Sequence, residues 1–480
     1  MEVKEEFTPD RIQLPPEEMR RLGYRVVDLL VEHFAHLHDD PVGRKGERPE
    51  LEAKLREPIP EEPGDPDAIL DTVQRDVLST MLHVDHPRFF AFVPGPGNFV
   101  SAMGDALAAG FNVFTGTWFA GSAPAQVEIV VLDWLRQICT LPEGAGGLLV
   151  SGGSMANLTA LATARHARLH DRTEGAVVYC SDQAHSSVAR ALRVLGFAPE
   201  QVRTLRSDEE FRLPMDAMRR EVAADRAAGR TPFCVVASAG TTNTGAVDPL
   251  PELAELCRAE GMWLHADGAY GAPAVLTDQG RPLLAGLGEV DSLSLDPHKW
   301  LFQSFETGCV LVRDRALLRA TFRTHPEYLR DTYGALEEVN FGEYGVQLTR
   351  GFRALKLWMS LKTFGLGAFR EAIARGIRLA EVAEEELRAS PRWEVVTPAR
   401  LAVVTFRYVA EGATEGEADA LTGRIVGAML ASGFAVVTST VLRGRTALRL
   451  CTINPRTTEE DVRETVRRLE EIGNRLSGKP

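Results

Sequence analysis

The sequence has little of several features that would assign the protein to a special class. It carries only six cysteines in 480 residues and no C-x-x-C pair, so neither a disulfide scaffold nor a cysteine metal site is indicated. No apolar run approaches the roughly 20 residues that cross a bilayer. Lys and Arg number 54 against 67 Asp and Glu, and the net charge of -13 argues against nucleic acid or anionic lipid as the main partner. We therefore expect a soluble, cytoplasmic protein that acts on a small molecule.

Hydrophobic periodicity divides the chain into three parts. Residues 1–85 are predicted to be helical, and their apolar residues from Met19 to Phe34 form one stripe, which packs either on the same chain or on a second subunit. Residues 86–365 alternate short apolar runs with amphipathic stretches, at 148–150, 176–180, 233–237, 262–266, 292–295 and 309–312. That alternation predicts an α/β domain with a mostly parallel sheet. Residues 366–480 predict a smaller α+β domain, with strands over 401–408, 434–438 and 446–451.

Small, polar and titratable residues follow the predicted strands of the middle region, where open α/β sheets bind ligands. Ser151-Gly152-Gly153-Ser154 follows the first run and opens a helix, which suits a phosphate because glycine lets backbone N–H groups approach it. His185 follows the second run, and Thr242 follows the third. Asp267 follows the fourth, where a carboxylate needs a partner, and Lys299 follows the fifth.

Each of these groups alone is more often structural than functional, but together they indicate one cofactor. A phosphate cradle, a flat ring, a hydroxyl-bearing turn, a buried acid and a reactive lysine are the groups that hold pyridoxal 5'-phosphate (PLP). The lysine supplies the amine for a Schiff base. His166 and His170 stand four residues apart on a predicted helix but lack the acid of a zinc motif, so no metal site is predicted.

Three motifs resemble the group II PLP-dependent amino acid decarboxylases. They are Ser-Asp-Gln-Ala-His-Ser-Ser at 181–187, His-Ala-Asp-Gly-Ala-Tyr at 265–270 and Asp-Pro-His-Lys-Trp at 296–300. The resemblance covers nearly the whole chain and is strongest to members that act on aromatic L-amino acids. It implies the fold type I of PLP enzymes, with a large domain over 86–365 and a small one over 366–480. It also implies a homodimer with the active site at its interface and the segment 1–85 swapped onto the partner.

The resemblance assigns a role to each matching residue. Lys299 would bind the cofactor covalently, Asp267 would pair with its pyridine nitrogen, and His185 would stack on its ring. The remaining cofactor contacts that it implies are Gly153, Ser154 and His298 at the phosphate, Thr242 beside the ring hydroxyl and Ala269 beneath the ring.

By the same resemblance, an apolar group lies where the family holds the substrate side chain, namely Phe92, Val93, Pro94 and Trp118. Burying an aromatic ring against such residues is favourable, whereas burying a carboxylate there is costly. We therefore expect phenylalanine, tyrosine, DOPA or tryptophan as the substrate rather than glutamate or aspartate.

One position departs from the family pattern. The resemblance implies a loop tyrosine that protonates the substrate carbon once carbon dioxide has left, placed between Tyr328-Leu329 and the motif that ends at Arg353. Counting back from Arg353 puts Phe341 at this place, and phenylalanine cannot donate a proton. In the related aromatic aldehyde synthases, the same substitution lets dioxygen react instead, giving aldehyde, ammonia and hydrogen peroxide. If the loop is shifted, Tyr333 or Tyr344 takes the tyrosine's place.

The function predicted from these motifs is PLP-dependent decarboxylation of an aromatic L-amino acid to the amine and carbon dioxide. The aldehyde synthase reaction is the alternative, because of Phe341. A PLP-binding scaffold without turnover is less favoured, since the motifs around Lys299 and Asp267 are intact.

Overall fold

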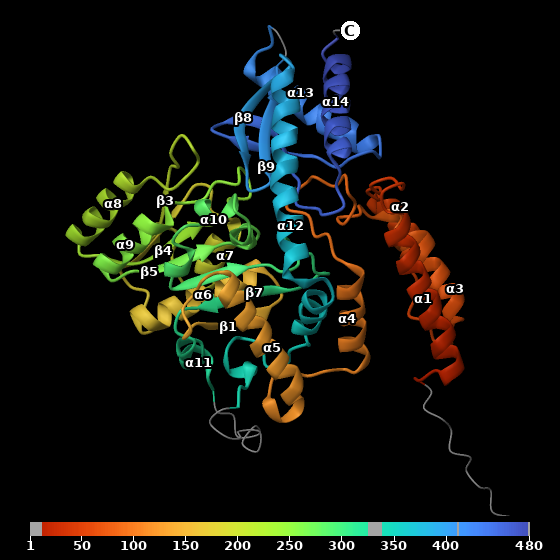
Figure 1. Cartoon of the computed structure of the whole chain (residues 1–480), viewed down its shortest axis with the longest axis horizontal. Helices are drawn as coiled ribbons and strands as arrows, with labels where there is room; N and C mark the ends of the chain where they lie inside the picture. The colour runs from red at the N-terminus through yellow and green to blue at the C-terminus, as the bar shows by residue number, and fades with distance from the viewer. Residues whose placement is uncertain (1–11, 325–337, 410–411, 479–480) are drawn as a thin grey trace, which may run out of the picture.

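Three parts follow one another along the chain in the structure, a computed structural model that describes residues 12–324, 338–409 and 412–478 (Figure 1). N-terminal helices come first, then an α/β part on a seven-stranded sheet, and then a smaller α+β part on a four-stranded sheet. The predicted fold class, a mostly parallel α/β domain with a small second domain, is confirmed. No helix among the described residues is long and apolar enough to span a membrane.

The N-terminal part consists of α1 (Pro16–His36), α2 (Arg48–Leu55) and α3 (Pro66–Thr72). Proline and two acids occupy the first turn of α1, where a missing N–H costs nothing and negative charge meets the helix dipole. None of the residues of α1 is buried within the described chain. The helix α2 forms inside the proline-rich stretch from 41 to 66, with Pro49 tolerated in its first turn, and none of its residues is buried by the described part of the chain.

The large sheet has the strand order β1-β7-β6-β5-β4-β2-β3, and β7 runs antiparallel to both of its neighbours while the other pairs are parallel. Its strands are β1 (Gly146–Val150), β2 (Ala176–Ser181), β3 (Val202–Leu205), β4 (Thr231–Ser238), β5 (Trp263–Asp267), β6 (Ser292–Leu295) and β7 (Gly308–Val312). Six lie within two residues of the predicted runs. The edge strand β3 escaped prediction because only Leu205 in it is buried, so no apolar run marks it.

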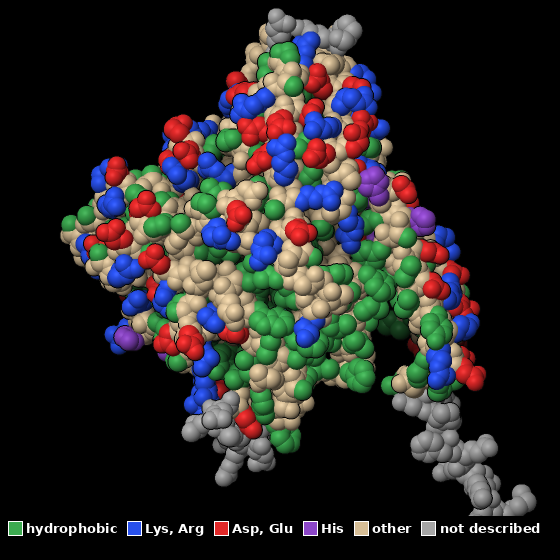
Figure 2. Space-filling view, in the orientation of Figure 1, with side chains coloured by type: hydrophobic (Ala, Val, Ile, Leu, Met, Phe, Trp, Pro, Cys, Tyr) green, Lys and Arg blue, Asp and Glu red, His purple; other side chains and the backbone are tan. Residues whose placement is uncertain are grey.

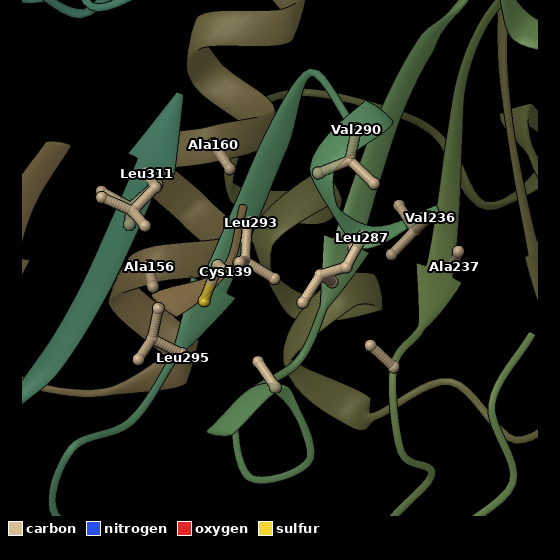
Figure 3. Close-up of a cluster of buried hydrophobic side chains, with 14 of the residues drawn as sticks. Cys139, Ala156, Ala160, Val236, Ala237, Leu287, Val290, Leu293, Leu295 and Leu311 are labelled. Atoms are coloured by element: carbon tan, nitrogen blue, oxygen red, sulfur yellow. The ribbon is translucent and has the colours of Figure 1, made fainter. Parts of the chain in front are cut away.

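Successive side chains on the central strand β6 point to opposite faces of the large sheet. On β6, Leu293 and Leu295 point to one face, and Ser292 and Ser294 point to the other. Figure 3 shows part of this core, where side chains of β4, β6, β7 and α6 gather around Leu293. The helices of this part are α4 (Phe99–Gly110), α5 (Trp118–Ile138), α6 (Gly153–Leu169), α7 (Ser186–Val194), α8 (Met215–Ala227), α9 (Leu250–Glu260), α10 (Gly280–Leu283) and α11 (Ala316–Phe322).

The helix α12 (Ala354–Ala389) connects the large part to the small one and is kinked at Gly365, whose φ is 72°. We propose this kink as the domain boundary. Beyond α12 lie β8 (Trp393–Arg400), β9 (Val403–Tyr408), α13 (Glu415–Ala431), β10 (Thr438–Leu442), β11 (Arg445–Cys451) and α14 (Glu459–Leu476).

In the small part, the strands predicted over 446–451 and 401–408 match β11 and β9 within two residues, but β8 was missed and the strand predicted over 434–438 was wrong. The structure has a hairpin, β8 and β9, where one strand was expected over 401–408, because Leu401 and Ala402 take positive φ and make a turn. The strand expected over 434–438 begins only at Thr438, and Val436 forms an isolated bridge to Phe89.

Candidate active site

The carboxyl ends of five strands of the large sheet surround one cavity of about 290 Å³. Every residue that the sequence analysis assigned to cofactor binding lines it: Gly153, Ser154, His185, Thr242, Asp267, Ala269, His298 and Lys299. These residues come from separate loops, and they meet because parallel strands end at the same edge of the sheet.

Lys299 is paired with an acid that the sequence analysis left without a role. Its Nζ lies 2.9 Å from Oδ2 of Asp296, whose side chain is only 2% exposed. A Cβ added to Gly153 would come within 2.9 Å of that same oxygen, so only glycine fits at this position. The other oxygen of Asp296 is buried and has no hydrogen-bond partner among the described residues. The lysine end of the cavity thus keeps both open space and an unsatisfied acceptor.

Asp267 ends β5 and is held by three hydrogen-bond donors. The side-chain amide of Asn157 donates to Oδ2 at 2.9 Å. The backbone N–H of Ala269 and the hydroxyl of Ser294 donate to Oδ1 at 3.1 and 3.2 Å. The sequence analysis expected the carboxylate of Asp267 to need a partner, and these three donors supply its hydrogen bonds. They fix the orientation of the carboxylate, which still lines the cavity.

His185 stands at the exposed rim of the cavity, directly before α7. Its Nδ1 lies 2.8 Å from the hydroxyl of Ser187, and the backbone N–H of Ser187 points to the same nitrogen at 3.3 Å. The ring is thus held at one edge, and its other edge remains available to a ligand.

The start of α6 and His298 lie at one end of the cavity, and their chemistry suits an anion. The first turn of a helix has N–H groups without helical partners, and together with the helix dipole they bind phosphate. Burial lowers the pKa of His298, and the backbone N–H of Thr307 donates to its Nδ1 at 3.2 Å. A neutral ring with an acceptor at Nδ1 carries its hydrogen on Nε2, where it can bond an anion.

The apolar residues expected around the substrate do not line this cavity within the single chain. Phe92 is 64% exposed and Val93 is half-buried. The ring of Phe305 covers Gly95 and lies 4.9 Å from the ring of His298, so Phe305 stands between the segment 92–95 and the cavity wall. Of the other two expected residues, Pro94 is buried and Trp118 is the first residue of α5.

The structure does not bring Phe341 to the cavity. Phe341 begins a short 3-10 turn and is 2% exposed, with the Arg350 guanidinium 5.0 Å from its ring centre and the Tyr344 ring 5.8 Å away. Phe341 therefore packs in the interior and does not line the cavity of the single chain. Tyr344 does not line the cavity either, and Tyr333 lies outside the described residues.

Sequence reasoning missed the polar residues beneath the cavity, above all Asn157 and Ser187. Asn157 is fully buried in α6, between residues that are mostly alanine and leucine. A lone amide on an apolar helix face was the signal that could have found it, because a buried amide must have hydrogen-bond partners.

Such a site, with a lysine and two acids at the carboxyl edge of a mostly parallel sheet, next to an anion-binding helix start, is that of a PLP-dependent enzyme. Residues 49–409 match the family described as "Pyridoxal-dependent decarboxylase conserved domain". The chain belongs to this family, and its cofactor is PLP.

Relatives of known name span nearly the whole chain. An aromatic-L-amino-acid decarboxylase of Bacillus atrophaeus is 48% identical, and the alignment covers 98% of each chain. A phenylacetaldehyde synthase of Arabidopsis thaliana is 30% identical over 96% of each. Among solved structures, Oryza sativa TDC with PLP and tryptamine superposes with a TM-score of 0.92 at 30% identity, covering 98% of this chain and all of that one.

Proposed function

We propose that this protein decarboxylates an aromatic L-amino acid, releasing the amine and carbon dioxide. The observation that carries the proposal is the placing of Lys299, Asp296 and Asp267 around one cavity in a chain of the pyridoxal-dependent decarboxylase family. The 48% identity to an aromatic-L-amino-acid decarboxylase supports the aromatic class of substrate.

The chain's own residues supply binding and proton control. Bound PLP supplies the electron sink that accepts the electron pair left when the carboxylate departs. Lys299 provides the amine that holds the cofactor, and Asp296, 2.9 Å away, is placed to take or return a proton of that amine. Asp267 presents an oriented carboxylate for the cofactor's ring nitrogen, and the start of α6 with His298 holds the phosphate.

Aromatic residues next to the cavity support an aromatic substrate. Phe305 is 57% exposed and contacts His298 at the cavity wall, and Phe92, 64% exposed, belongs to the segment 92–95 that Phe305 covers at Gly95. We propose that Phe92, Val93, Pro94 and Trp118 contribute to the apolar surface that receives the substrate ring. Burying such a ring contributes about 1.5–3 kcal/mol of affinity, which an acidic side chain would not gain.

The decisive assay follows amine, carbon dioxide and hydrogen peroxide together, with phenylalanine, tyrosine, DOPA and tryptophan as substrates in aerated buffer. We expect amine in equal amount to carbon dioxide, with no peroxide. Peroxide in equal amount to carbon dioxide would instead establish the aldehyde synthase reaction that one relative's name describes. Turnover of glutamate faster than of any aromatic amino acid would contradict the substrate class.

Replacing the cofactor-binding lysine tests the assignment of the site. Lys299→Ala removes the amine that binds the cofactor, so we expect loss of carbon dioxide release and of the cofactor's visible absorbance. Lys362→Ala, which changes an exposed lysine outside the cavity, is the matched control and should keep both. Full activity in Lys299→Ala would refute the site.

We further propose that the protein is a cytoplasmic homodimer with the active site near the interface. All six cysteines are buried and unpaired, which suits a reducing compartment. The face of α1 has no buried residue, and side chains as large as Tyr24, Val27 and Val31 are exposed on it. Figure 2 shows hydrophobic side chains gathered on the body of the molecule beside this helix.

A further inference from the structure

The amide of Asn157 joins two parts of the site from beneath. Its Nδ2 lies 2.9 Å from Oδ2 of Asp267 and 2.8 Å from Oγ of Ser187. Because an ionised carboxylate can only accept hydrogen bonds, the NH₂ group must face Asp267, and this sets the orientation of the amide. Its oxygen then faces Nε2 of His265 at 2.9 Å, so this nitrogen carries a hydrogen.

The hydrogen bonds on the other side of His265 also have only one possible direction. Burial lowers the pKa of His265 to about 4, so at neutral pH the ring has one hydrogen, which lies on Nε2. Its Nδ1 therefore accepts from the hydroxyl of Ser292, 2.9 Å away. The oxygen of Ser292 accepts in turn from the indole N–H of Trp263 at 2.8 Å, and an indole can only donate. In this buried series of hydrogen bonds, from Asn157 to Trp263, the donor and the acceptor of each bond are therefore determined.

A second series of hydrogen bonds runs from Asn157 through Ser187 to His185 at the cavity rim. Since Oγ of Ser187 accepts the second N–H of Asn157, its own hydrogen is free to point to Nδ1 of His185, 2.8 Å away. The backbone N–H of Ser187 points to the same nitrogen. Two donors at Nδ1 leave no place for a hydrogen there on a neutral ring, so the hydrogen lies on Nε2.

We propose that this chain of hydrogen bonds, from Trp263 through Ser292, His265, Asn157 and Ser187, holds Asp267 in place and selects the Nε2–H tautomer of His185. Its members are positioning residues, because none of them needs to touch the substrate. The chain is sealed from solvent: Asn157, His265 and Ser292 are fully buried, and Ser187 and Trp263 are 2% exposed. Among the described residues Nε2 of His185 has no partner, so its N–H is left for a ligand.

The tautomer decides what His185 offers to the cavity. An N–H at Nε2 donates to an anionic oxygen or supplies a hydrogen, whereas a lone pair there would accept one. On the proposed function, on which this consequence rests, a donor suits a substrate that brings a carboxylate and later needs a proton. A base at this place would suit removal of a substrate proton, which decarboxylation does not require.

The tautomer is measured directly by ring ¹⁵N–¹H correlation spectra of the PLP-loaded protein labelled with ¹⁵N-histidine, without substrate. The His185 signal is identified by its loss in His185→Gln. At a pH at which the ring is neutral, we expect the wild type to show only the Nε2–H tautomer. Ser187→Ala removes the shorter of the two contacts to Nδ1 and leaves only the backbone N–H at 3.3 Å, so the Nδ1–H form should appear beside the Nε2–H form, and Ser187→Thr should restore the single form. A Ser187→Ala spectrum with the Nε2–H form alone would overturn the proposal.

The control in this turn is Ser186→Ala, because the hydroxyl of Ser186 is exposed and bonds nothing among the described residues. A merely structural role of Ser187 would lower the melting temperature without changing the tautomer, so the spectrum separates the two cases.

The other branch of the chain is tested by cofactor affinity. Asn157→Leu leaves Asp267 with one donor fewer, and we expect the dissociation constant for PLP to rise about tenfold or more. Thr159→Val, on the same helix, removes a buried hydroxyl that has no partner among the described residues, and should leave this constant unchanged. If Asn157→Leu and the wild type bind PLP with equal affinity, the proposed role of Asn157 in holding Asp267 is wrong. Neither measurement uses substrate, so carbon dioxide release tests the proposed function independently.

Discussion

Glu128 and Arg350 form an ion pair in the interior, next to the strand that precedes the turn proposed to hold the phosphate. Both side chains are at most 1% exposed, and Oε1 of Glu128 lies 2.5 Å from Nη2 of Arg350. Each also bonds the backbone of Leu149 on β1, whose N–H donates to Glu128 and whose carbonyl accepts from Arg350. The pair therefore ties β1, just before Ser151, to the segment that begins α12.

Breaking this pair should destabilise the fold strongly. Arg350→Met leaves Glu128 buried without its counter-charge, and we expect a loss of about 3–5 kcal/mol in the free energy of unfolding. Urea denaturation measures it. Arg378→Met removes an exposed ion pair with Glu385 and serves as the control, with a much smaller expected loss because solvent screens the pair. Equal losses in the two variants would contradict the burial argument.

A substitution at Phe341 tests whether this residue acts in packing or in catalysis. Because it is 2% exposed and outside the cavity, Phe341→Tyr should leave the ratio of amine to peroxide unchanged. The added hydroxyl has to be buried, so we expect a stability loss of about 1–3 kcal/mol. Product analysis and thermal unfolding measure the two effects. A change in that ratio in this variant would return Phe341 to the reaction.

At the scale of elements, α1 is joined to the body by a hydrogen bond that depends on pH. Nε2 of His33 lies 2.8 Å from Oδ2 of Asp85, and the ring of His83 is 5.3 Å from that of His33. The hydrogen bond to Asp85 raises the pKa of His33, and the pKa of Asp85 is lowered because the bond and charge of His33 outweigh its burial. The charges of Asp40 and Arg456 act on His33 in opposite directions.

The docking of α1 should weaken as the pH rises. A raised pKa in the folded state means that docking is stabilised below the ordinary value of 6.5 and that this contribution is lost as the pH passes the raised value. Asp85 stays ionised throughout this range, since its pKa lies below 3.8. Hydrogen exchange in α1, corrected for the intrinsic rate, should therefore be faster at pH 8.5 than at pH 6.

The matched variants locate this pH dependence on one side chain. His33→Gln should abolish the difference between the two pH values, whereas His36→Gln, in the last turn of the same helix, should retain it. A difference that persists in His33→Gln would mean that another group controls the docking of α1.

At the scale of the whole molecule, large apolar side chains remain exposed on the described chain near α1, α4 and α5. Phe111 and Phe119 are 79% and 77% exposed, and Val31 on α1 is 49% exposed. Monomeric proteins seldom expose large apolar patches, so this surface suits a second copy of the chain.

The proposed homodimer makes a simple prediction about mass. Light scattering should give about 105 kDa, twice the 52.6 kDa of one chain. Val31→Glu places a charge on the α1 face and should shift the equilibrium towards monomer, with a parallel loss of carbon dioxide release because the active site is near the interface. Val441→Glu, on the exposed surface of β10, should change neither. A fully active monomeric wild type would reject the dimer.

The sequence alone determined most strands of the large sheet and the polar residues that follow them, because both depend on residues that are neighbours in the chain. Apolar runs marked six strands of the large sheet, and the eight residues predicted to bind the cofactor all line one cavity, because parallel strands end at the same edge of the sheet. Positions set by packing between distant segments could not be predicted in this way. Asn157 meets Asp267 and His265 only when α6 packs on β5, and Phe341 is buried only in the folded core, where Arg350 lies over its ring. Sequence spacing records none of these contacts, since they join residues tens to hundreds of positions apart or depend on burial that only the folded chain creates.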